Sequence, residues 1–158
     1  MTTPTSFDER AFRDALGRFA TGVTIVTCNG PDGPMGITAN SFASLSLDPP
    51  LVLWSPAKSS RRHDAFMNAT EFAIHIASFD QLELCRDFAK SSSGPKDTHW
   101  ELSATGCPYL SGGAARFMCE KHETFDGGDH TIIVGKVSEF YASDENALIF
   151  QQGFYKSS

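Results

Sequence analysis

The spacing of hydrophobic and polar positions divides the chain into a few helices and a larger number of strands. Apolar side chains at helical spacing predict a helix over residues 7–20, and shorter helices are predicted over residues 60–69 and 78–89. Two of these segments begin with a capping box, in which a serine precedes a glutamate or glutamine by three positions: Ser6 with Glu9, and Ser78 with Gln81.

Alternating and β-branched segments predict the strands. Residues 23–28 and 35–46 flank the turn sequence NGPDGP and are predicted to form a hairpin. Residues 114–125 and 130–141 flank a Gly-Gly turn in DGGD and predict a second hairpin. Further strands are predicted at residues 51–55, 72–77 and 147–151, whereas residues 91–113 form a long loop. Because the strands outnumber the helices and follow one another, a predominantly antiparallel β-barrel with a few flanking helices is expected.

Composition is consistent with this picture and limits the function. The chain has 158 residues, of which 41% are hydrophobic and 20% charged, as in one globular domain; residues 1–10 are expected to be flexible. A net charge of −6 argues against a nucleic-acid or anionic membrane surface, although Lys58, Arg61 and Arg62 form one basic cluster. The chain start lacks the apolar core of a signal peptide and no apolar run reaches membrane length, so a cytoplasmic location is expected.

Several common catalytic patterns are missing from the sequence. It contains no G-x-G-x-x-G, no phosphate loop, no H-E-x-x-H and no G-x-S-x-G. Cys119 and His122 have a C-x-x-H spacing, but an offset of three on a strand points them to opposite faces, so no metal site is predicted. The four cysteines are far apart and are expected to be buried free thiols.

Three segments carry candidate chemistry. In residues 36–46 a strand would place hydroxyl and amide side chains on one face and small apolar ones on the other. That surface suits a flavin ring, which needs exposed backbone polar groups and little side-chain bulk, but composition alone favours a solvent-exposed sheet face. The segment SPAKSSRR combines hydroxyls and cations that suit a phosphate, and His130 follows a tight turn beside Asp129. Each of these, taken alone, is more often an ordinary surface feature.

Taken together, these segments closely resemble the short-chain flavin reductase family. The matching stretches are FATGVTIVT, GITANSFASLSLDPPLVL, FAIHIAS followed by DFA, and GDHTIIVGKV, in the family's order from about Phe12 to Tyr155. The resemblance implies a split β-barrel homodimer that binds FMN or FAD and reduces it with NADH or NADPH. It also implies that the reduced flavin passes to a separate flavin-dependent oxygenase.

The resemblance assigns site residues segment by segment. The wall along the flavin ring is formed by Thr38, Ala39, Asn40 and Ser41, and the same segment contributes Ser44 and Ser46. The residues that match the ribityl phosphate region are Ser55, Ser59, Ser60 and Arg61. A further flavin-contacting segment comprises Phe88, Ala89 and Lys90. The motif linked to the nicotinamide nucleotide comprises Gly128, Asp129 and the candidate catalytic residue His130, and the chain end contributes Gly153, Phe154 and Tyr155.

Two departures from the family leave the cofactors open. Phe154 replaces a common arginine, which removes one phosphate contact and leaves NADH and NADPH as alternatives. The stretch SSRRHDAF is more basic than usual and would suit a larger or more anionic flavin, so FMN and FAD both remain open. The segment 91–113 matches only loosely, apart from GCPYL.

The expected reaction is hydride transfer from nicotinamide C4 to flavin N5, a step that needs no acid or base from the protein. An alternative is a flavin-binding electron carrier without nicotinamide turnover, which shares the same barrel and pocket. The G-D-H motif favours the reductase. A third alternative is a barrel similar to pyridoxamine-phosphate oxidase that uses FMN on another substrate, which these local motifs do not favour.

Overall fold

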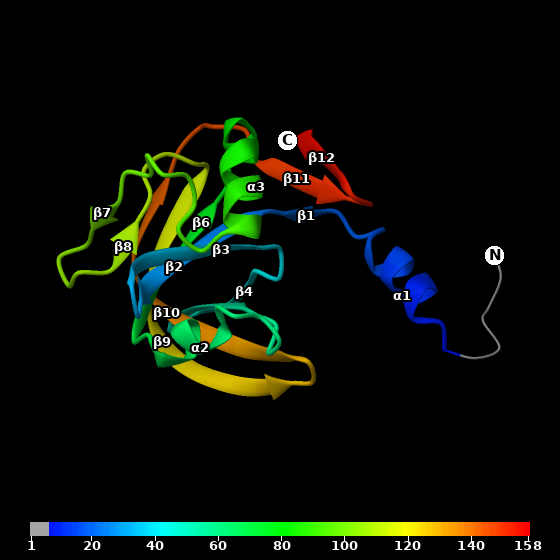
Figure 1. The fold of residues 1–158 in the computed structure, drawn as a ribbon, viewed down its shortest axis with the longest axis horizontal. Coiled ribbons are helices and arrows are strands. Elements are labelled where there is room, and N and C mark those ends of the chain that lie inside the picture. Colours follow the sequence, from blue (N-terminus) through cyan, green and yellow to red (C-terminus); the bar gives the residue numbers. More distant parts are fainter. Residues whose placement is uncertain (1–6) are drawn as a thin grey trace.

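Strands dominate the structure, a computed structural model that describes residues 7–158 (Figure 1). Its helices are α1 (Glu9–Leu16), α2 (His63–Asn68) and α3 (Leu82–Lys90), with a 3-10 turn, η1 (Phe79–Gln81), before α3. Its strands are β1 (Thr21–Gly22), β2 (Thr24–Gly30), β3 (Gly33–Ala39), β4 (Ala43–Leu47), β5 (Pro50–Trp54), β6 (Glu71–Ile76), β7 (Glu101–Leu102), β8 (Pro108–Tyr109), β9 (Ala115–Gly127), β10 (His130–Ala142), β11 (Leu148–Gln151) and β12 (Phe154–Ser157). The predicted mainly β class is confirmed.

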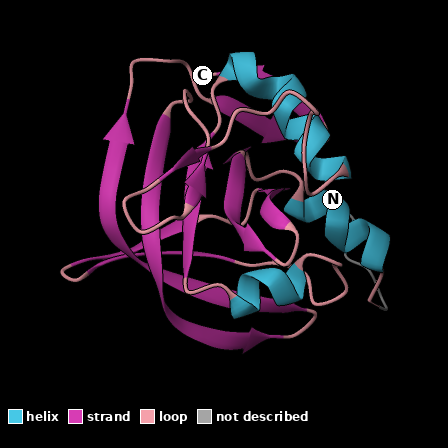
Figure 2. Ribbon diagram, turned by 60° about the vertical axis from the view of Figure 1, so that its left-hand side comes forward, coloured by secondary structure: helices cyan, strands magenta, loops and turns pink. Residues whose placement is uncertain are grey.

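Seven strands form one antiparallel sheet in the order β3-β2-β6-β9-β10-β5-β4. Its two edge strands, β3 and β4, are consecutive in the chain and are joined only by residues 40–42. Four Cα–Cα steps span at most about 14 Å, so the sheet curls until Ala39 and Ala43 approach each other, and its curvature is visible in Figure 2. No backbone pairing joins β3 to β4 in the described chain, and the fold is therefore a split barrel.

A second sheet, in the order β1-β11-β12, brings the C-terminal strands beside the start of the barrel. Two apolar clusters form most of the core. One fills the barrel around Trp54, Phe66 and Phe72, and the other lies under α3 and includes Phe88 and Leu148. Helix α3 packs closely on β3, because a Cβ at Gly36 would come within 2.9 Å of the Phe88 ring.

The four cysteines, Cys28, Cys85, Cys107 and Cys119, are buried and free, as predicted. Burial raises the pKa of each thiol to about 12, so all four are protonated at neutral pH. A protonated, buried thiol behaves as a small apolar side chain.

The hairpin predicted from residues 23–28 and 35–46 is confirmed for β2 and β3, but the second strand is not continuous. It breaks at residues 40–42, and β4 then pairs with β5 at the other edge of the sheet. A bulge leaves Leu45 without a partner between Ser44 and Ser46, so alternation does not persist along this segment. The predicted single polar face over residues 36–46 is therefore wrong.

The first helix is shorter than predicted. Helix α1 begins after Asp8, whose carboxylate accepts two backbone N–H groups of the first turn at 3.0 and 3.2 Å, and it ends at Leu16, just before Gly17. The predicted capping residue Ser6 lies outside the described residues, as do residues 1–6 of the start predicted to be flexible.

Two details near the chain end also differ from expectation. In the second hairpin Gly127 pairs with His130, so the two-residue turn is Gly128–Asp129 rather than Gly127–Gly128. Gly128 has a φ of 77°, a conformation that glycine adopts without strain. Strand β12 was not predicted, because the stretch FYKS is too short to show a clear period.

Residues 91–113 form a long connection, as predicted, but they contain the β7–β8 pair and are anchored to the barrel. The Thr27 hydroxyl donates to the carbonyl of Pro108 at 2.7 Å, and the Leu110 N–H donates to His75 Nε2 at 2.9 Å. His75 Nδ1 in turn donates to the carbonyl of Ile25 at 2.7 Å. His75 is completely buried, and burial lowers its pKa from about 6.5 to about 4.

This buried histidine predicts a specific loss of stability in mild acid. The unfolded chain takes up a proton at His75 near pH 6.5, whereas the folded chain does so only near pH 4, so stability falls as the pH drops through this range. One such proton contributes up to about 1.4 kcal/mol per pH unit. We expect His75→Gln to be less stable than the parent at pH 7 but to lose less stability between pH 6.5 and 4. Urea unfolding at several pH values measures this difference.

The matched control is His122→Gln, because His122 is exposed on β9. This variant should keep the parent pH dependence. Equal pH slopes for His75→Gln and the parent would contradict the assignment.

Candidate functional site

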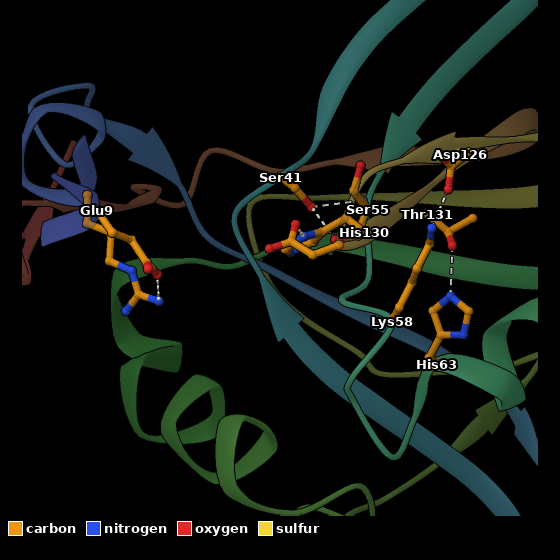
Figure 3. Close-up of polar contacts among 10 residues, drawn as sticks. Glu9, Ser41, Ser55, Lys58, His63, Asp126, His130 and Thr131 are labelled. Carbon is orange, nitrogen blue, oxygen red and sulfur yellow. Dashed lines mark hydrogen bonds and ion pairs between the residues drawn. The ribbon is translucent and has the colours of Figure 1, made fainter. Parts of the chain in front are cut away.

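Three segments meet where the barrel is split, and the first is the connection between β3 and β4. Residues 40–42 pair with no strand in the described chain, so their peptide groups are available to a ligand. The Ser41 hydroxyl accepts the Ser55 N–H at 2.8 Å and donates to the Ser55 carbonyl at 3.3 Å (Figure 3). This pair ties the connection to the end of β5.

The loop 55–62 then contacts the tip of the β9–β10 hairpin. Ala57 and His130 form an isolated β-bridge, the Lys58 N–H donates to the Asp129 carbonyl at 2.9 Å, and the Thr131 N–H donates to the Pro56 carbonyl at 3.0 Å. These backbone bonds hold the tip in a fixed position beside the loop. They place His130 near Ser55, and Figure 3 shows Ser41, Ser55 and His130 in one region, although Ser55 and His130 are 75 positions apart in the sequence.

Side chains reinforce the same contact. The Lys58 ammonium group pairs with Asp126, and the His63 Nε2 lies 2.8 Å from the Thr131 hydroxyl (Figure 3). The hydrogen bond from Lys58 and the charge of its ammonium group lower the pKa of Asp126. The loop and the hairpin tip are therefore joined by both backbone and side-chain contacts.

His130 lies at the rim and is partly open to solvent. Its side chain is 46% exposed, and Nδ1 lies 2.8 Å from Asp129 Oδ1. The hydrogen bond and charge of His130 lower the pKa of Asp129, so this carboxylate remains ionised to lower pH than usual. With Nδ1 engaged by Asp129, Nε2 is the ring nitrogen left for a ligand. Asp129 therefore orients the ring.

The start of the predicted flavin wall borders a small cavity of about 190 Å³. Thr38, Ala39 and Asn40 form one side of this cavity, and Tyr155 and Phe150 lie on another. The structure thus brings Tyr155, from the chain end, beside the predicted wall. The Thr38 hydroxyl donates to the carbonyl of Cys85 at 2.6 Å, which fixes β3 to α3.

The end of α3 is linked to the loop 55–62 by Arg62, the neighbour of Arg61, which is predicted to contact the flavin phosphate. The Arg62 guanidinium donates to the carbonyl of Gly36 at 3.2 Å and to that of Ala89 at 3.4 Å, and it also donates to the carbonyl of Phe88. Arg61 is exposed and makes no hydrogen bond or ion pair in the described part of the chain. The two neighbouring arginines therefore differ: the Arg62 side chain stabilises the fold, whereas the Arg61 side chain is available to bind a ligand.

Several predicted site residues do not present their side chains as the sequence implies. The Phe88 side chain is fully buried against Trp100 at a centroid distance of 5.9 Å, so only its backbone is near the site. Ser44 is exposed and Ser46 half-buried on the opposite edge strand, separated from Thr38 by the break in the strand. Phe154 is exposed on β12 and Gly153 lies in the turn before it.

Three residues that are not among the predicted site residues help to build the site: Arg62, which the sequence places only in a basic cluster, and His63 and Thr131. The sequence does not indicate which of two adjacent arginines bonds within the fold. His63 and Thr131 are 68 positions apart, so no local pattern links them. Only their contacts in space identify them. Among residues 7–158 no group of three or more histidine, cysteine, aspartate or glutamate side chains is arranged to hold a metal ion.

The donor set at the split fits the flavin that the resemblance implies. The open peptide groups of residues 40–42 can meet the polar edge of a flat ring. The hydroxyl of Ser59 and the cations of Arg61 and Lys90 can meet a phosphate, and all three residues are exposed. No helix in the described residues is long and apolar enough to cross a membrane.

Comparison with known proteins agrees with this geometry. A family model described as flavin reductase like domain matches residues 16–158. The chain is 51% identical over 152 residues to the FMN reductase (NADH) of Agrobacterium fabrum, covering 96% of this chain and 87% of that protein. It is 42% identical over 148 residues to the reductase component of a flavin-dependent trigonelline monooxygenase from Acinetobacter baylyi, covering 92% of this chain. It spans only about half, 48%, of the length of that second relative.

Solved structures include a similar fold with both nucleotides. The Streptomyces globisporus NADH:FAD oxidoreductase in complex with NAD and FAD fragments superposes with a TM-score of 0.87 and 36% identity. The match covers 94% of this chain and 92% of that one.

Proposed function

This chain belongs to the flavin reductase like domain family, and we propose on that premise that it reduces FMN or FAD with NADH or NADPH. The observation that carries the proposal is the meeting of three family segments at the split. Residues 40–42, the loop 55–62 and the hairpin tip around His130 are far apart in sequence but are joined by direct hydrogen bonds.

The bound flavin supplies the hydride acceptor and the nicotinamide nucleotide supplies the hydride. The chain's own residues bind and orient them. Peptide N–H groups of residues 40–42 would meet the polar edge of the ring, where their dipoles stabilise the charge gained on reduction. Arg61 and Lys90 would neutralise the flavin phosphate, and His130 would hold the nicotinamide nucleotide through Nε2.

We also propose that the reduced flavin passes to a separate oxygenase. The support is that a relative 42% identical to this chain is the reductase component of a flavin-dependent monooxygenase. The site is at the rim of the barrel rather than in a closed interior, so a flavin has a route in and out.

We further propose that the protein is a homodimer. Helix α1 has no buried residue and extends away from the sheets in Figure 1, and its apolar side chains Phe12 and Leu16 are 48% and 58% exposed. An eight-residue helix that has no buried residue is only marginally stable in water. The edge strand β4 exposes Leu45 and Leu47 as well. A second copy that covers these surfaces would explain both.

The reductase proposal predicts oxidation of NADH or NADPH that depends on added flavin. The purified protein is mixed with each nicotinamide nucleotide and with FMN, FAD or riboflavin, and the loss of nucleotide absorbance is followed. We expect turnover with at least one pairing. No oxidation with any pairing, together with tight flavin binding, would contradict the proposal.

His130→Ala is expected to raise the KM for the nicotinamide nucleotide by about tenfold, because it removes one hydrogen bond that can carry charge. The affinity for flavin should change little, since His130 lies on the hairpin tip and not in the flavin segments. Steady-state kinetics and a flavin titration separate the two effects. His122→Ala, on the same hairpin but away from the tip, is the control; an unchanged KM in His130→Ala would remove this role.

The dimer proposal predicts a mass of twice the chain mass of 17.2 kDa in light scattering. Replacing Phe12 and Leu16 by aspartate should shift the population toward the monomer, because two charges cannot be buried in an apolar interface without a large cost. Asp14→Ala, which lies between them and faces away, should leave the mass unchanged. A monomeric parent protein would contradict the proposal.

A further inference from the structure

The tip of the β9–β10 hairpin, which carries His130, has little support from the main sheet. Strand β10 pairs with β5 only over residues 133–136, and β9 pairs with β6 only over residues 115–120. Residues 125–132 therefore extend past both neighbouring strands as a two-stranded ribbon. Because an isolated two-stranded hairpin is only marginally stable in water, the position of His130 depends on the contacts that hold this ribbon from the side.

Thr131 joins the tip to the body of the protein by both its backbone and its side chain. Its N–H donates to the Pro56 carbonyl at 3.0 Å, and its hydroxyl lies 2.8 Å from His63 Nε2 (Figure 3). Thr131 is only 7% exposed, whereas the side chain of the adjacent His130 is 46% exposed. Neighbouring side chains on a strand point to opposite faces, so a Thr131 held on the inner face directs His130 to the rim.

His63 reaches Thr131 from a firmly packed helix. It is the first residue of α2, whose Phe66 is buried against Trp54 with the ring centroids 4.9 Å apart. The His63 side chain is itself only 14% exposed, and its Nδ1 lies 3.2 Å from Asp64 Oδ1. Both ring nitrogens are therefore engaged, and the ring connects the barrel core to the hairpin tip.

Two side-chain contacts hold the tip, and they differ in strength. The Lys58–Asp126 ion pair is exposed, with side chains 43% and 78% accessible, so water and salt weaken it. The His63–Thr131 hydrogen bond is shielded from solvent, and loss of one partner would leave the other with a polar group that water does not easily reach. A hydroxyl can donate or accept, so this bond forms with the imidazole neutral or protonated. The His63–Thr131 bond is thus the stronger of the two.

We propose that His63 is a positioning residue for the nicotinamide nucleotide, because its hydrogen bond to Thr131 fixes the hairpin tip that presents His130. The inference rests on the proposed function, in which His130 holds the nucleotide through Nε2. A tip released from His63 would spend only part of its time in the competent position, and the apparent affinity for the nucleotide falls by that fraction. Bound nucleotide selects the competent position, so turnover at saturation is not affected.

Steady-state kinetics test this role. We expect His63→Ala to raise the KM for the nicotinamide nucleotide by about fivefold, the effect of losing one hydrogen bond, with kcat and flavin affinity nearly unchanged. Thr131→Val should give a similar rise, because it removes the hydroxyl and nearly keeps the shape. His63→Gln, whose amide can bond the same hydroxyl, should restore most of the affinity. The matched control is His122→Ala, an exposed histidine of β9 outside the ribbon, which should behave as the parent.

A double-mutant cycle separates positioning from a general loss of structure. If His63 acts through the tip, His63→Ala should raise the KM in the parent but have no further effect in the His130→Ala background. The effects of His63→Ala and Thr131→Val should likewise not add. An unchanged KM in the parent background, or an equal rise in the His130→Ala background, would overturn the proposal.

Amide hydrogen exchange measures the tip directly and needs no nucleotide. The N–H groups of Lys58 and Thr131 bond across the contact between the loop 55–62 and the tip. They should exchange about fivefold faster in His63→Ala, whereas the amides of β2, a strand paired on both sides, should keep the parent rates. Unchanged rates at Lys58 and Thr131, or the same acceleration in β2, would contradict a fixed tip.

The positioning proposal and the reductase proposal fail in different ways. Turnover with a KM that does not depend on His63 rejects only the positioning role. If no flavin supports NADH oxidation, the reductase proposal fails, and the exchange rates together with the dissociation constant of NADH still test His63. A protein that does not bind NADH at all would overturn both.

Discussion

The two edges of the main sheet are joined by only three residues, and this short connection constrains the rest of the molecule. Residues 40–42 cannot bridge opposite ends of a flat seven-stranded sheet, so the sheet must curl until β3 and β4 come close. The β2–β3 pairing ends before these three residues and the β4–β5 pairing begins after them, so their backbone polar groups have no strand partner. One constraint thus produces both the barrel shape and an open strip of backbone at its split.

The remaining parts of the site depend on that split through a chain of hydrogen bonds. Ser41 is tied to Ser55, the loop that follows is bridged to His130, and Arg62 joins the same loop to β3 and α3. Each contact joins only two segments, but together the contacts hold four regions of the chain around one rim. A reaction that transfers a hydride between two bound nucleotides requires this kind of fixed relative placement more than it requires an acid or base.

The barrel and helix α1 differ in how well their side chains are packed. The barrel interior is closely packed. His75 anchors the long segment 91–113 by accepting the Leu110 N–H at Nε2, a buried hydrogen bond that requires the neutral ring, while its Nδ1–H donates to the Ile25 carbonyl of β2. Helix α1, by contrast, has no buried residue and exposes apolar side chains. This contrast is the physical basis for the proposal that a second copy covers α1, whereas the long segment is part of the rigid body.

The sequence by itself determined the mainly β class, the β2–β3 and β9–β10 hairpins and the family, because these follow from local periodicity, turn residues and short motifs. The wide spacing of the four cysteines likewise predicted that they are free. Tertiary structure alone decided that the predicted strand 35–46 breaks at residues 40–42, since that break reflects competition between β2 and β5 for pairing rather than any local breaker. It also decided that Arg62 is internal and Arg61 free, and that Phe88 points into the core. A side chain's local sequence does not specify which distant carbonyl or ring it will meet, and only the curled sheet brings those partners together.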